Sequence, residues 1–340
     1  MNRWVVPCFA LCSSMFVISA VNAEEADSVD KAREALTKQE GDSDSAQQLE
    51  EVFQAAEKNY SLIKKGGMSL SYSFDYSYFG DQRLDIDIVN GSFRNADVVP
   101  SASHTFTNTF SIDYGLLNNV TVSARFPFVA KFDTQEERSN TDLGDASFSL
   151  RWQPTAYVPG KMSTTVFGSF GTKTGTSPYE IDINKQLSTG SGTYSLSGGA
   201  SMSKVLDPVV LYGSLSVSYN MPVDGLNQVR GGALLTEVKQ GMGISMSSGF
   251  SYSLSYDISL SGSIQLSYSN ETELTLLAGP VKFTSVSQDQ ISSIMNFSIG
   301  TRVSETTIVN TNVGFGLTED SPDVLIGISM PINIDGLKKL

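Results

Sequence analysis

The chain has 340 residues, of which 40% are hydrophobic and only 17% are charged, and its formal net charge at pH 7 is −13. So little charge excludes a disordered chain or a coiled-coil rod. The acidic balance argues against nucleic-acid binding, which needs clustered Lys and Arg. Beyond residue 23, no apolar run approaches the roughly 20 residues that a spanning helix needs. If this chain enters a membrane, it does not cross it with helices.

Residues 1–23 have the pattern of a secretory signal peptide. Arg3 precedes a long apolar stretch, and small residues at 21–23 form a cleavage site. Cys8 and Cys12 both lie in this segment, so the mature chain has no thiol, no disulfide framework and no Cys-based metal site. The sequence therefore predicts export, with no cofactor and no metal. The periplasm, the outer membrane and the exterior of the cell stay open as destinations.

Residues 24–66 are predicted to form a periplasmic helical segment, since Ala, Glu, Gln, Lys and Leu dominate and Pro is absent. Apolar residues near its end are separated alternately by three and four positions, the spacing of a coiled-coil seam. Two interpretations stay open: one amphipathic helix that packs against its own domain, or a self-associating coiled coil. The residues of this candidate oligomer seam are Ala46, Leu49, Phe53, Ala56, Tyr60 and Ile63.

Residues 67–340 are predicted to form a single β domain, because apolar residues recur there at every second position. Twelve segments show this alternation, each close to the 9 to 11 residues with which a tilted strand crosses a bilayer. The predicted strands are 68–78, 106–116, 120–132, 146–152, 162–172, 194–202, 209–221, 242–254, 258–268, 293–301, 307–317 and 324–332.

The connections between these strands alternate in length. Short connections fall at 117–119, 154–160, 206–208, 255–257 and 303–306. Long ones fall between them at 80–103, 133–143, 175–192, 222–240 and 269–290, followed by a brief last loop at 318–323. Outer-membrane barrels have short periplasmic turns and longer outer loops, whereas a soluble sandwich has no reason for this asymmetry. The predicted fold is all-β, a twelve-stranded antiparallel transmembrane β-barrel preceded by the helical segment, in the bacterial outer membrane.

The polar faces of the predicted strands are rich in Ser and Gly, as at residues 195–203 and 259–267. Side chains this small would leave a water-filled lumen in a barrel of twelve strands. The charged residues on these faces are either wall salt bridges that stiffen the barrel or a mixed-sign constriction that selects solutes. The candidate constriction comprises Asp75, Asp113, Arg125, Lys131, Asp145, Arg151, Lys173 and Arg302.

Four short motifs carry a resemblance to a known family. They are GLLNNV at 115–120, DLGD at 142–145, TKTG at 172–175 and STGSG at 188–192. Together they resemble the outer-membrane barrels associated with the meta-pathway of phenol degradation, and the resemblance extends from residue 68 to the C-terminus. It implies a role in transport across the outer membrane.

The helical segment ahead of twelve strands is also similar to the functional-amyloid (Fap) secretion channel. This second resemblance implies a homotrimer whose periplasmic coiled coils gate the barrel or recruit cargo, and a secreted polypeptide as that cargo.

Catalysis is not expected. His104 is the only histidine, and an outer-membrane lipase would need it beside a Ser nucleophile. The neighbouring positions on the same face of its strand hold Ala102 and Phe106. The sequence thus predicts a channel or transporter for a solute or an exported polypeptide. The alternative is a non-conducting structural or recruiting barrel whose periplasmic helices bind a partner.

Overall fold

The computed structural model describes residues 62–89, 92–134, 138–158, 160–182, 185–230, 233–304 and 307–332, with the side chains of 81–101 left out. The predicted signal peptide and residues 24–61 of the predicted helical segment lie outside these ranges. Within them, we find no helix of the length and apolar character needed to span a membrane.

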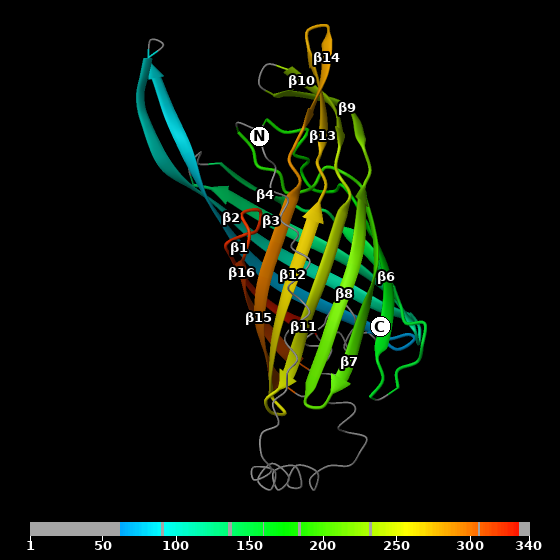
Figure 1. Ribbon diagram of the computed structural model, residues 1–340. Helices are drawn as coiled ribbons and strands as arrows, with labels where there is room; N and C mark the ends of the chain where they lie inside the picture. The colour runs from blue at the N-terminus through cyan, green and yellow to red at the C-terminus, as the bar shows by residue number, and fades with distance from the viewer. Residues whose placement is uncertain are drawn as a thin grey trace, which may run out of the picture. The chain divides into compact units, whose positions relative to one another are not determined.

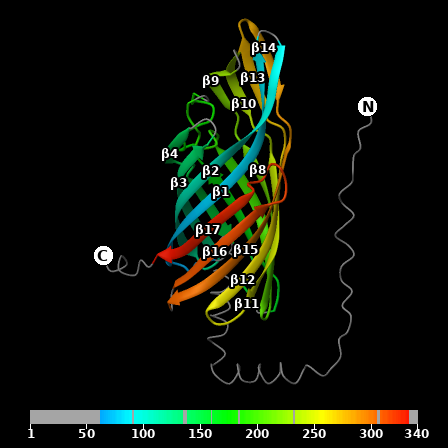
Figure 2. The ribbon, with the colours of Figure 1, turned by 90° about the vertical axis from the view of Figure 1, so that its left-hand side faces the viewer.

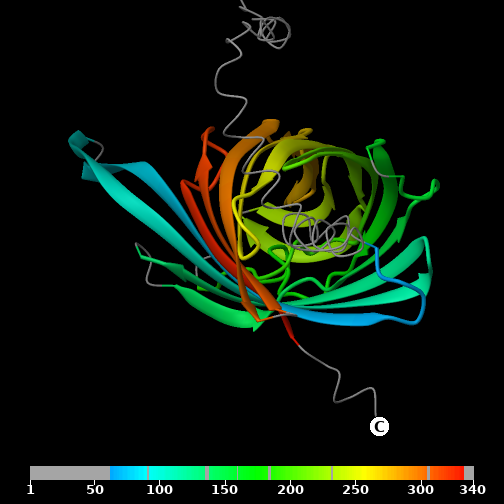
Figure 3. The same cartoon turned by 90° about the horizontal axis from the view of Figure 1, so that it is seen from below.

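Twelve strands form a closed antiparallel barrel (Figures 1 and 3). Each strand pairs with its neighbours in chain order, and β1 pairs with both β2 and β17, which closes the ring. The twelve predicted strands are therefore confirmed. The barrel strands are β1 (Met68–Val89), β2 (Ser92–Leu117), β3 (Val120–Asp133), β5 (Ser147–Trp152), β6 (Ser163–Gly171), β7 (Ser195–Leu206), β8 (Val209–Asn220), β11 (Gly243–Ser253), β12 (Ile258–Ser269), β15 (Gln290–Ser304), β16 (Thr307–Gly316) and β17 (Val324–Ile332).

The outer surface of the barrel is apolar because alternate residues of each strand point outward. On β7, Leu196 and Met202 are 54% and 48% exposed, whereas the inward-facing Ser201 is 4% exposed. Aromatic rings of neighbouring strands also meet on the outside, as in the Phe106–Phe132 pair with centroids 5.9 Å apart. Large apolar side chains exposed around a whole barrel suit a lipid-facing surface and not one in contact with water.

The prediction of a long loop at 80–103 is wrong for most of these residues. β1 and β2 stay paired far beyond Tyr78 and His104, out to the pair Val89 and Ser92. The two strands project as a hairpin past the end of the barrel wall (Figure 2). The reason lies in the sequence, where apolar residues at 84, 86 and 88 alternate with charged ones and so continue the period of a strand.

The predicted strand at 120–132 has a second partner on one side that the sequence did not indicate. β4 (Ser139–Leu143) pairs with the loop-end half of β3, and β5 pairs with the other half. Residues 144–146 separate β4 from β5, and the Gly144 N–H donates to the Pro127 carbonyl across this break. β3 is thus bordered along its length by two short strands instead of one long one.

Two of the predicted long loops form a second small sheet beyond the end of the barrel, here called the cap sheet (Figure 1). Its order is β14-β13-β10-β9, so the hairpins from the two loops pair side by side through β10 and β13. It buries an apolar cluster of Tyr179, Leu226, Ala233, Leu235, Val238 and Leu276. Its strands are β9 (Val223–Arg230), β10 (Ala233–Lys239), β13 (Glu273–Ala278) and β14 (Val281–Val286).

The cap sheet holds the loop that joins β6 to β7, here called the β6–β7 loop. Gln228 Nε2 donates to the Pro178 carbonyl at 3.0 Å and to the Ile181 carbonyl at 2.6 Å. Gln240 Nε2 donates to the Tyr179 hydroxyl at 2.8 Å. The Gln228 amide satisfies two backbone carbonyls in a loop that lacks a ladder of its own. The tip of the β6–β7 loop is thereby fixed against the cap sheet.

Three charged side chains form a cluster on the cap sheet. Lys239 Nζ lies 2.9 Å from Glu237 Oε1, and Lys282 Nζ lies 4.0 Å from Glu237 Oε2. The hydrogen bond from Lys239 holds the pKa of Glu237 below its ordinary value, and the same bond raises the pKa of Lys239. Because folding lowers the pKa of Glu237, the pair stabilises the cap sheet at neutral pH. This stabilisation is lost as the pH falls through the pKa that Glu237 has in the folded protein.

Candidate functional site in the barrel interior

One half of the barrel interior is lined by hydroxyl groups. Inward-facing Ser side chains on neighbouring strands lie opposite each other and hydrogen-bond across the ladder. The oxygen atoms are 2.6 Å apart in the pair Ser169–Ser197 and 2.7 Å apart in the pair Ser214–Ser247. These pairs lie on β6, β7, β8 and β11. This wall is rich in hydroxyl groups, as the Ser-rich sequence predicted, and also carries the rings of Phe167 and Tyr212.

The opposite wall, built from β1, β2, β3 and β5, carries most of the candidate charges. Arg151 Nη2 donates to Asp113 Oδ1 at 2.6 Å and to Ser123 Oγ at 2.9 Å, and Ser123 Oγ also donates to the same carboxylate oxygen. Arg151 is only 5% exposed. This group spans three adjacent strands, so for these two predicted residues the geometry is that of a wall salt bridge.

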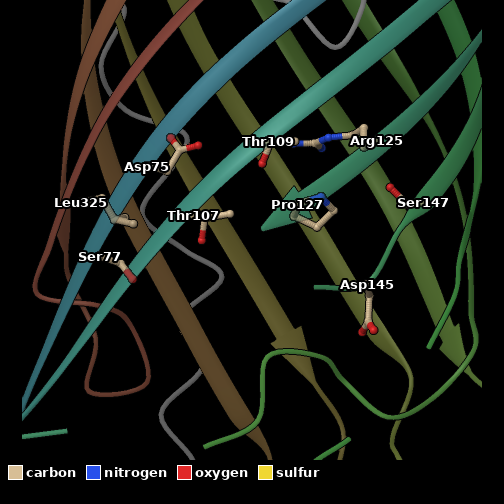
Figure 4. Close-up of a pocket in the computed structure, with 9 residues that line it drawn as sticks. All are labelled: Asp75, Ser77, Thr107, Thr109, Arg125, Pro127, Asp145, Ser147 and Leu325. Atoms are coloured by element: carbon tan, nitrogen blue, oxygen red, sulfur yellow. The ribbon is translucent and has the colours of Figure 1, made fainter. Parts of the chain in front are cut away.

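A cavity of about 370 Å³ opens beside this ion pair on the same wall (Figure 4). Three of the predicted residues, Asp75 on β1, Arg125 on β3 and Asp145 just before β5, bring their charged groups to it. The remaining lining residues are four hydroxyl-bearing ones and two without polar side-chain atoms: Ser77, Thr107, Thr109, Ser147, Pro127 and Leu325. The cavity is thus polar and carries both signs of charge.

Asp145 has a second role, because its carboxylate binds both limbs of the β6–β7 loop. Asp145 Oδ1 accepts the Gly175 N–H at 3.0 Å, and Oδ2 accepts the Ser191 N–H at 2.6 Å and the Ser191 hydroxyl at 2.7 Å. The limbs touch each other here, since a Cβ on Gly175 would lie 2.7 Å from the Cα of Gly190. Only residues without a side chain fit this approach.

The second limb of the β6–β7 loop, which contains Leu187 and Thr189, is also tied to β4. Thr189 Oγ1 donates to the Leu143 carbonyl at 2.9 Å, and Asn140 Nδ2 donates to the Leu187 carbonyl at 2.6 Å. Backbone and side-chain bonds of the loop therefore replace a strand partner for β4 in this part of the wall.

The other predicted charges do not line the cavity. Lys131 is on the inward face of β3, near Asp145. Lys173 Nζ lies 5.6 Å from the ring centroid of Tyr194, and Arg302 Cζ lies 4.6 Å from that of Tyr256. The structure therefore brings three of the eight candidate residues together at the cavity, pairs two in the wall, and places the remaining three elsewhere.

The chain just before β1 lies against the inner wall near the turn end of the barrel. Ile63 N–H donates to Thr121 Oγ1 at 2.9 Å, and Thr121 is fully buried. Gly66 N–H donates to the Gly115 carbonyl at 2.8 Å, and Gly115 N–H donates to the Gly67 carbonyl at 3.0 Å.

These contacts correct the end of the predicted helical segment. Residues 62–67 are not helical, so Ile63 does not belong to a helical seam. The reason is that its N–H bonds to the barrel wall and not to a carbonyl four residues earlier. The other residues of the predicted oligomer seam lie outside the described residues: Ala46, Leu49, Phe53, Ala56 and Tyr60.

Substituting Gly115→Ala is expected to release residues 62–67 from the wall, since a Cβ there would lie 2.5 Å from the Ile63 carbonyl oxygen and nearer still to that of Lys64. Backbone atoms cannot yield as a flexible side chain can. We expect the amide of Ile63 to exchange with solvent at least about tenfold faster, which is about 1.4 kcal/mol of lost protection. Hydrogen exchange by mass spectrometry measures this.

The matched control is Gly168→Ala, because a Cβ there would meet nothing closer than 3.7 Å. Equal exchange at Ile63 in the two variants would contradict the close contact at Gly115.

His104 faces outward among aromatic side chains. Its Nδ1 lies 2.9 Å from the Tyr76 hydroxyl, and its ring centroid lies 5.4 Å from that of Tyr78. The described hydrogen-bond partner of this histidine is therefore a tyrosine and not the serine that a lipase dyad would require.

Two functional features were missed in the sequence. The TKTG and STGSG motifs gave no indication that Asp145 binds both, and the cap sheet was predicted as loop. The alternation within residues 233–239 and 273–278, with Leu at 235 and 276, could have indicated its strands. In the described ranges, no three His, Cys, Asp or Glu side chains gather as metal ligands.

No protein-family model matches the chain. Among solved structures, the chain is similar to the COG4313 outer membrane channel from Pseudomonas putida F1, with a TM-score of 0.59, 12% identity, and coverage of 80% of this chain and 97% of that one. The translocator domain of the autotransporter NalP from Neisseria meningitidis has a TM-score of 0.48 and 10% identity, with coverage of 92% of this chain and 100% of that one. The TodX monoaromatic hydrocarbon channel has a TM-score of 0.46 and 8% identity, with coverage of 79% of this chain and 91% of that one.

At 12% identity, the first likeness concerns the fold alone. Together with the closed ring of twelve strands and its apolar exterior, it shows that the chain has the fold of an outer-membrane β-barrel. The predicted fold class is thereby confirmed for the β domain.

Proposed function

We propose that this protein is a channel of the bacterial outer membrane and passes a small solute through the barrel. The observation that carries the proposal is the cavity on the inner wall, where Asp75, Arg125 and Asp145 lie among hydroxyl groups. Asp113 and Arg151 pair with each other within the wall and do not line this cavity. Charged groups that line a cavity instead favour interaction with a solute.

The size of the cavity favours a small solute over a secreted polypeptide. About 370 Å³ lies at the lower end of the range of small-molecule pockets. The hydroxyl-rich wall of β6, β7, β8 and β11 can hydrogen-bond a passing solute at many positions. The Pseudomonas putida F1 protein is an outer membrane channel, and the shared fold agrees with such a role here. The homotrimer implied by the resemblance to the Fap channel stays a proposal for residues 46–60.

The proposal predicts discrete current steps when the full-length chain is reconstituted in a planar lipid bilayer. Asp75→Asn and Arg125→Gln are expected to shift its cation-to-anion selectivity in opposite directions, by a factor of about two or more, since each removes one charge from the permeation path. Reversal potentials in a salt gradient measure this.

If neither the full-length chain nor a variant without residues 24–61 conducts current, the channel proposal is overturned and a non-conducting recruiting barrel is favoured. A matched control is Lys161→Gln, which removes a charge from the exposed turn between β5 and β6. It is expected to leave the selectivity unchanged.

A further inference from the structure

Both carboxylates of the cavity already have partners. Asp145 accepts three hydrogen bonds from the β6–β7 loop, and Lys131 lies near enough to interact with it electrostatically. Asp75 has an interaction partner of its own. Its carboxylate lies over β17, because a Cβ on Gly327 would come within 2.5 Å of Asp75 Oδ1. Neither negative charge therefore needs a ligand to satisfy it.

The groups of the cavity that have no partner are hydrogen-bond donors. Arg125 is exposed, and neither an ion pair nor a hydrogen bond joins its guanidinium to any residue in the described ranges. In the same part of the chain, four hydroxyl groups line the cavity without a side-chain hydrogen bond, those of Ser77, Thr107, Thr109 and Ser147. A guanidinium only donates, and each hydroxyl can donate once. The cavity thus suits a ligand that is rich in acceptors and negatively charged.

Strand register places two of these hydroxyl groups within reach of Arg125. Arg125 on β3 pairs with Ser147 on β5, and directly opposite residues have Cβ atoms about 5 Å apart. Thr109 on β2 pairs with Pro127, so it is the diagonal neighbour of Arg125, at about 7–8 Å. Figure 4 shows the Arg125 side chain extended across the wall toward β2. The guanidinium therefore has a hydroxyl donor on the strand to either side.

We propose that the cavity binds a small carboxylate that carries a single negative charge and a short hydrocarbon chain. The Arg125 guanidinium donates two parallel hydrogen bonds to this carboxylate. The hydroxyl groups of Thr109 and Ser147 donate to the lone pairs that remain. Pro127 and Leu325, the two lining residues without polar side-chain atoms, contact the hydrocarbon chain. This inference rests on the proposed function, since the ligand is the solute of that channel.

The carboxylates of the cavity limit the charge of the ligand. Asp75 and Asp145 line the same cavity as Arg125, and no second cation is among its described lining residues. The guanidinium offsets the first negative charge of a ligand, whereas a second would lie near these carboxylates without a cation to offset it. A dicarboxylate should therefore bind more weakly than a monocarboxylate of the same length. A neutral amide should also bind more weakly, because it offers Arg125 no charge.

The test uses isothermal titration calorimetry on the purified full-length chain in detergent micelles. The probes are butyrate, butyramide and succinate, which share a chain length and differ in charge. We expect butyrate to bind at least about tenfold more tightly than butyramide, a difference of about 1.4 kcal/mol. It should bind at least about threefold more tightly than succinate. Arg125→Gln is expected to weaken butyrate by at least about tenfold and to change the affinity for butyramide by less than about twofold.

Arg125→Lys keeps the charge and loses the paired hydrogen bonds, so its affinity for butyrate should lie between those of the wild-type chain and Arg125→Gln. Lys161→Gln is the control, because this residue lies in the turn between β5 and β6 and does not line the cavity. It should bind butyrate as the wild-type chain does.

Equal affinity for butyrate and butyramide overturns the inference, as does unchanged binding of butyrate in Arg125→Gln. Tighter binding of succinate than of butyrate overturns the single charge. The same preparations are tested for conductance. Current without binding of butyrate overturns the inference and supports the channel, whereas binding without current supports the site and overturns the channel.

Discussion

Replacing Arg151 with Met is expected to lower the free energy of unfolding of the barrel by about 3–5 kcal/mol, the typical result of removing one partner from a buried ion pair. Arg151 is 5% exposed and sits 2.6 Å from Asp113 Oδ1. Without the guanidinium, the Asp113 carboxylate keeps only the Ser123 hydroxyl among these contacts, in a wall largely shielded from water. Unfolding by urea in lipid vesicles measures the loss.

Two further variants separate charge from packing. The double variant Asp113→Asn with Arg151→Met removes both charges and is expected to recover more than half of the lost stability, because no uncompensated charge remains. Arg125→Gln, which removes an exposed arginine from the same wall, is expected to change the free energy of unfolding by less than about 0.5 kcal/mol. If Arg151→Met unfolds at the same urea concentration as Arg125→Gln, the pair does not stabilise the barrel.

Most of the barrel could be predicted because its chemistry is local. A strand between lipid and a polar interior must alternate, and alternation is visible within ten residues. The parity of that alternation also indicated that Asp75 and Arg125 face inward, and both line the cavity. The turns were equally readable, since short connections such as 117–119 leave antiparallel neighbours no other arrangement.

The arrangement of the site could not be predicted because it depends on register between strands. Asp113 meets Arg151 only because β2 pairs Asp113 with Ser123 while β3 pairs Thr121 with Arg151. A shift of one residue would turn Arg151 to the lipid face. Register of this kind is fixed by the whole barrel, so parity alone did not indicate that Asp113 and Arg151 would pair.

The contacts of Asp145 are remote in sequence for the same reason. Its carboxylate reaches Gly175, 30 residues later, and Ser191, 46 residues later. The motifs at 172–175 and 188–192 resembled family patterns, but only the folded loop shows that both limbs converge on one side chain. The cap sheet joins two loops in a comparable way, with β10 and β13 as partners.

Substituting Asp145→Ala is expected to free the β6–β7 loop while the barrel stays folded. Three hydrogen bonds to a charged group are lost, each typically about 1.5–3 kcal/mol when formed. Allowing for non-additivity, the loop should open about 100-fold more often, which corresponds to about 3 kcal/mol. Trypsin cleavage after Lys185, whose side chain is 80% exposed in this loop, measures the opening.

The matched control is Asp142→Ala, which also removes a carboxylate near the loop. Among the described residues of that loop, the Thr176 hydroxyl is the one group that donates to Asp142 Oδ2, at 2.6 Å. Loss of this single bond should raise cleavage by less than about tenfold. Equal cleavage in the two variants would mean that Asp145 does not hold the limbs. Unfolding of the whole barrel is distinguished by cleavage at sites in the strands.

Asp145→Asn separates the charge from the hydrogen bonds. The amide oxygen still accepts from the loop, whereas its amide nitrogen faces donors and cannot accept, so roughly one of the two acceptor positions is lost. Cleavage is expected between that of the wild-type chain and that of Asp145→Ala. The cavity, however, loses the negative charge of Asp145 in both variants, because Asp145 also lines it. Ion selectivity should therefore change equally in the two, and only the opening of the loop should differ.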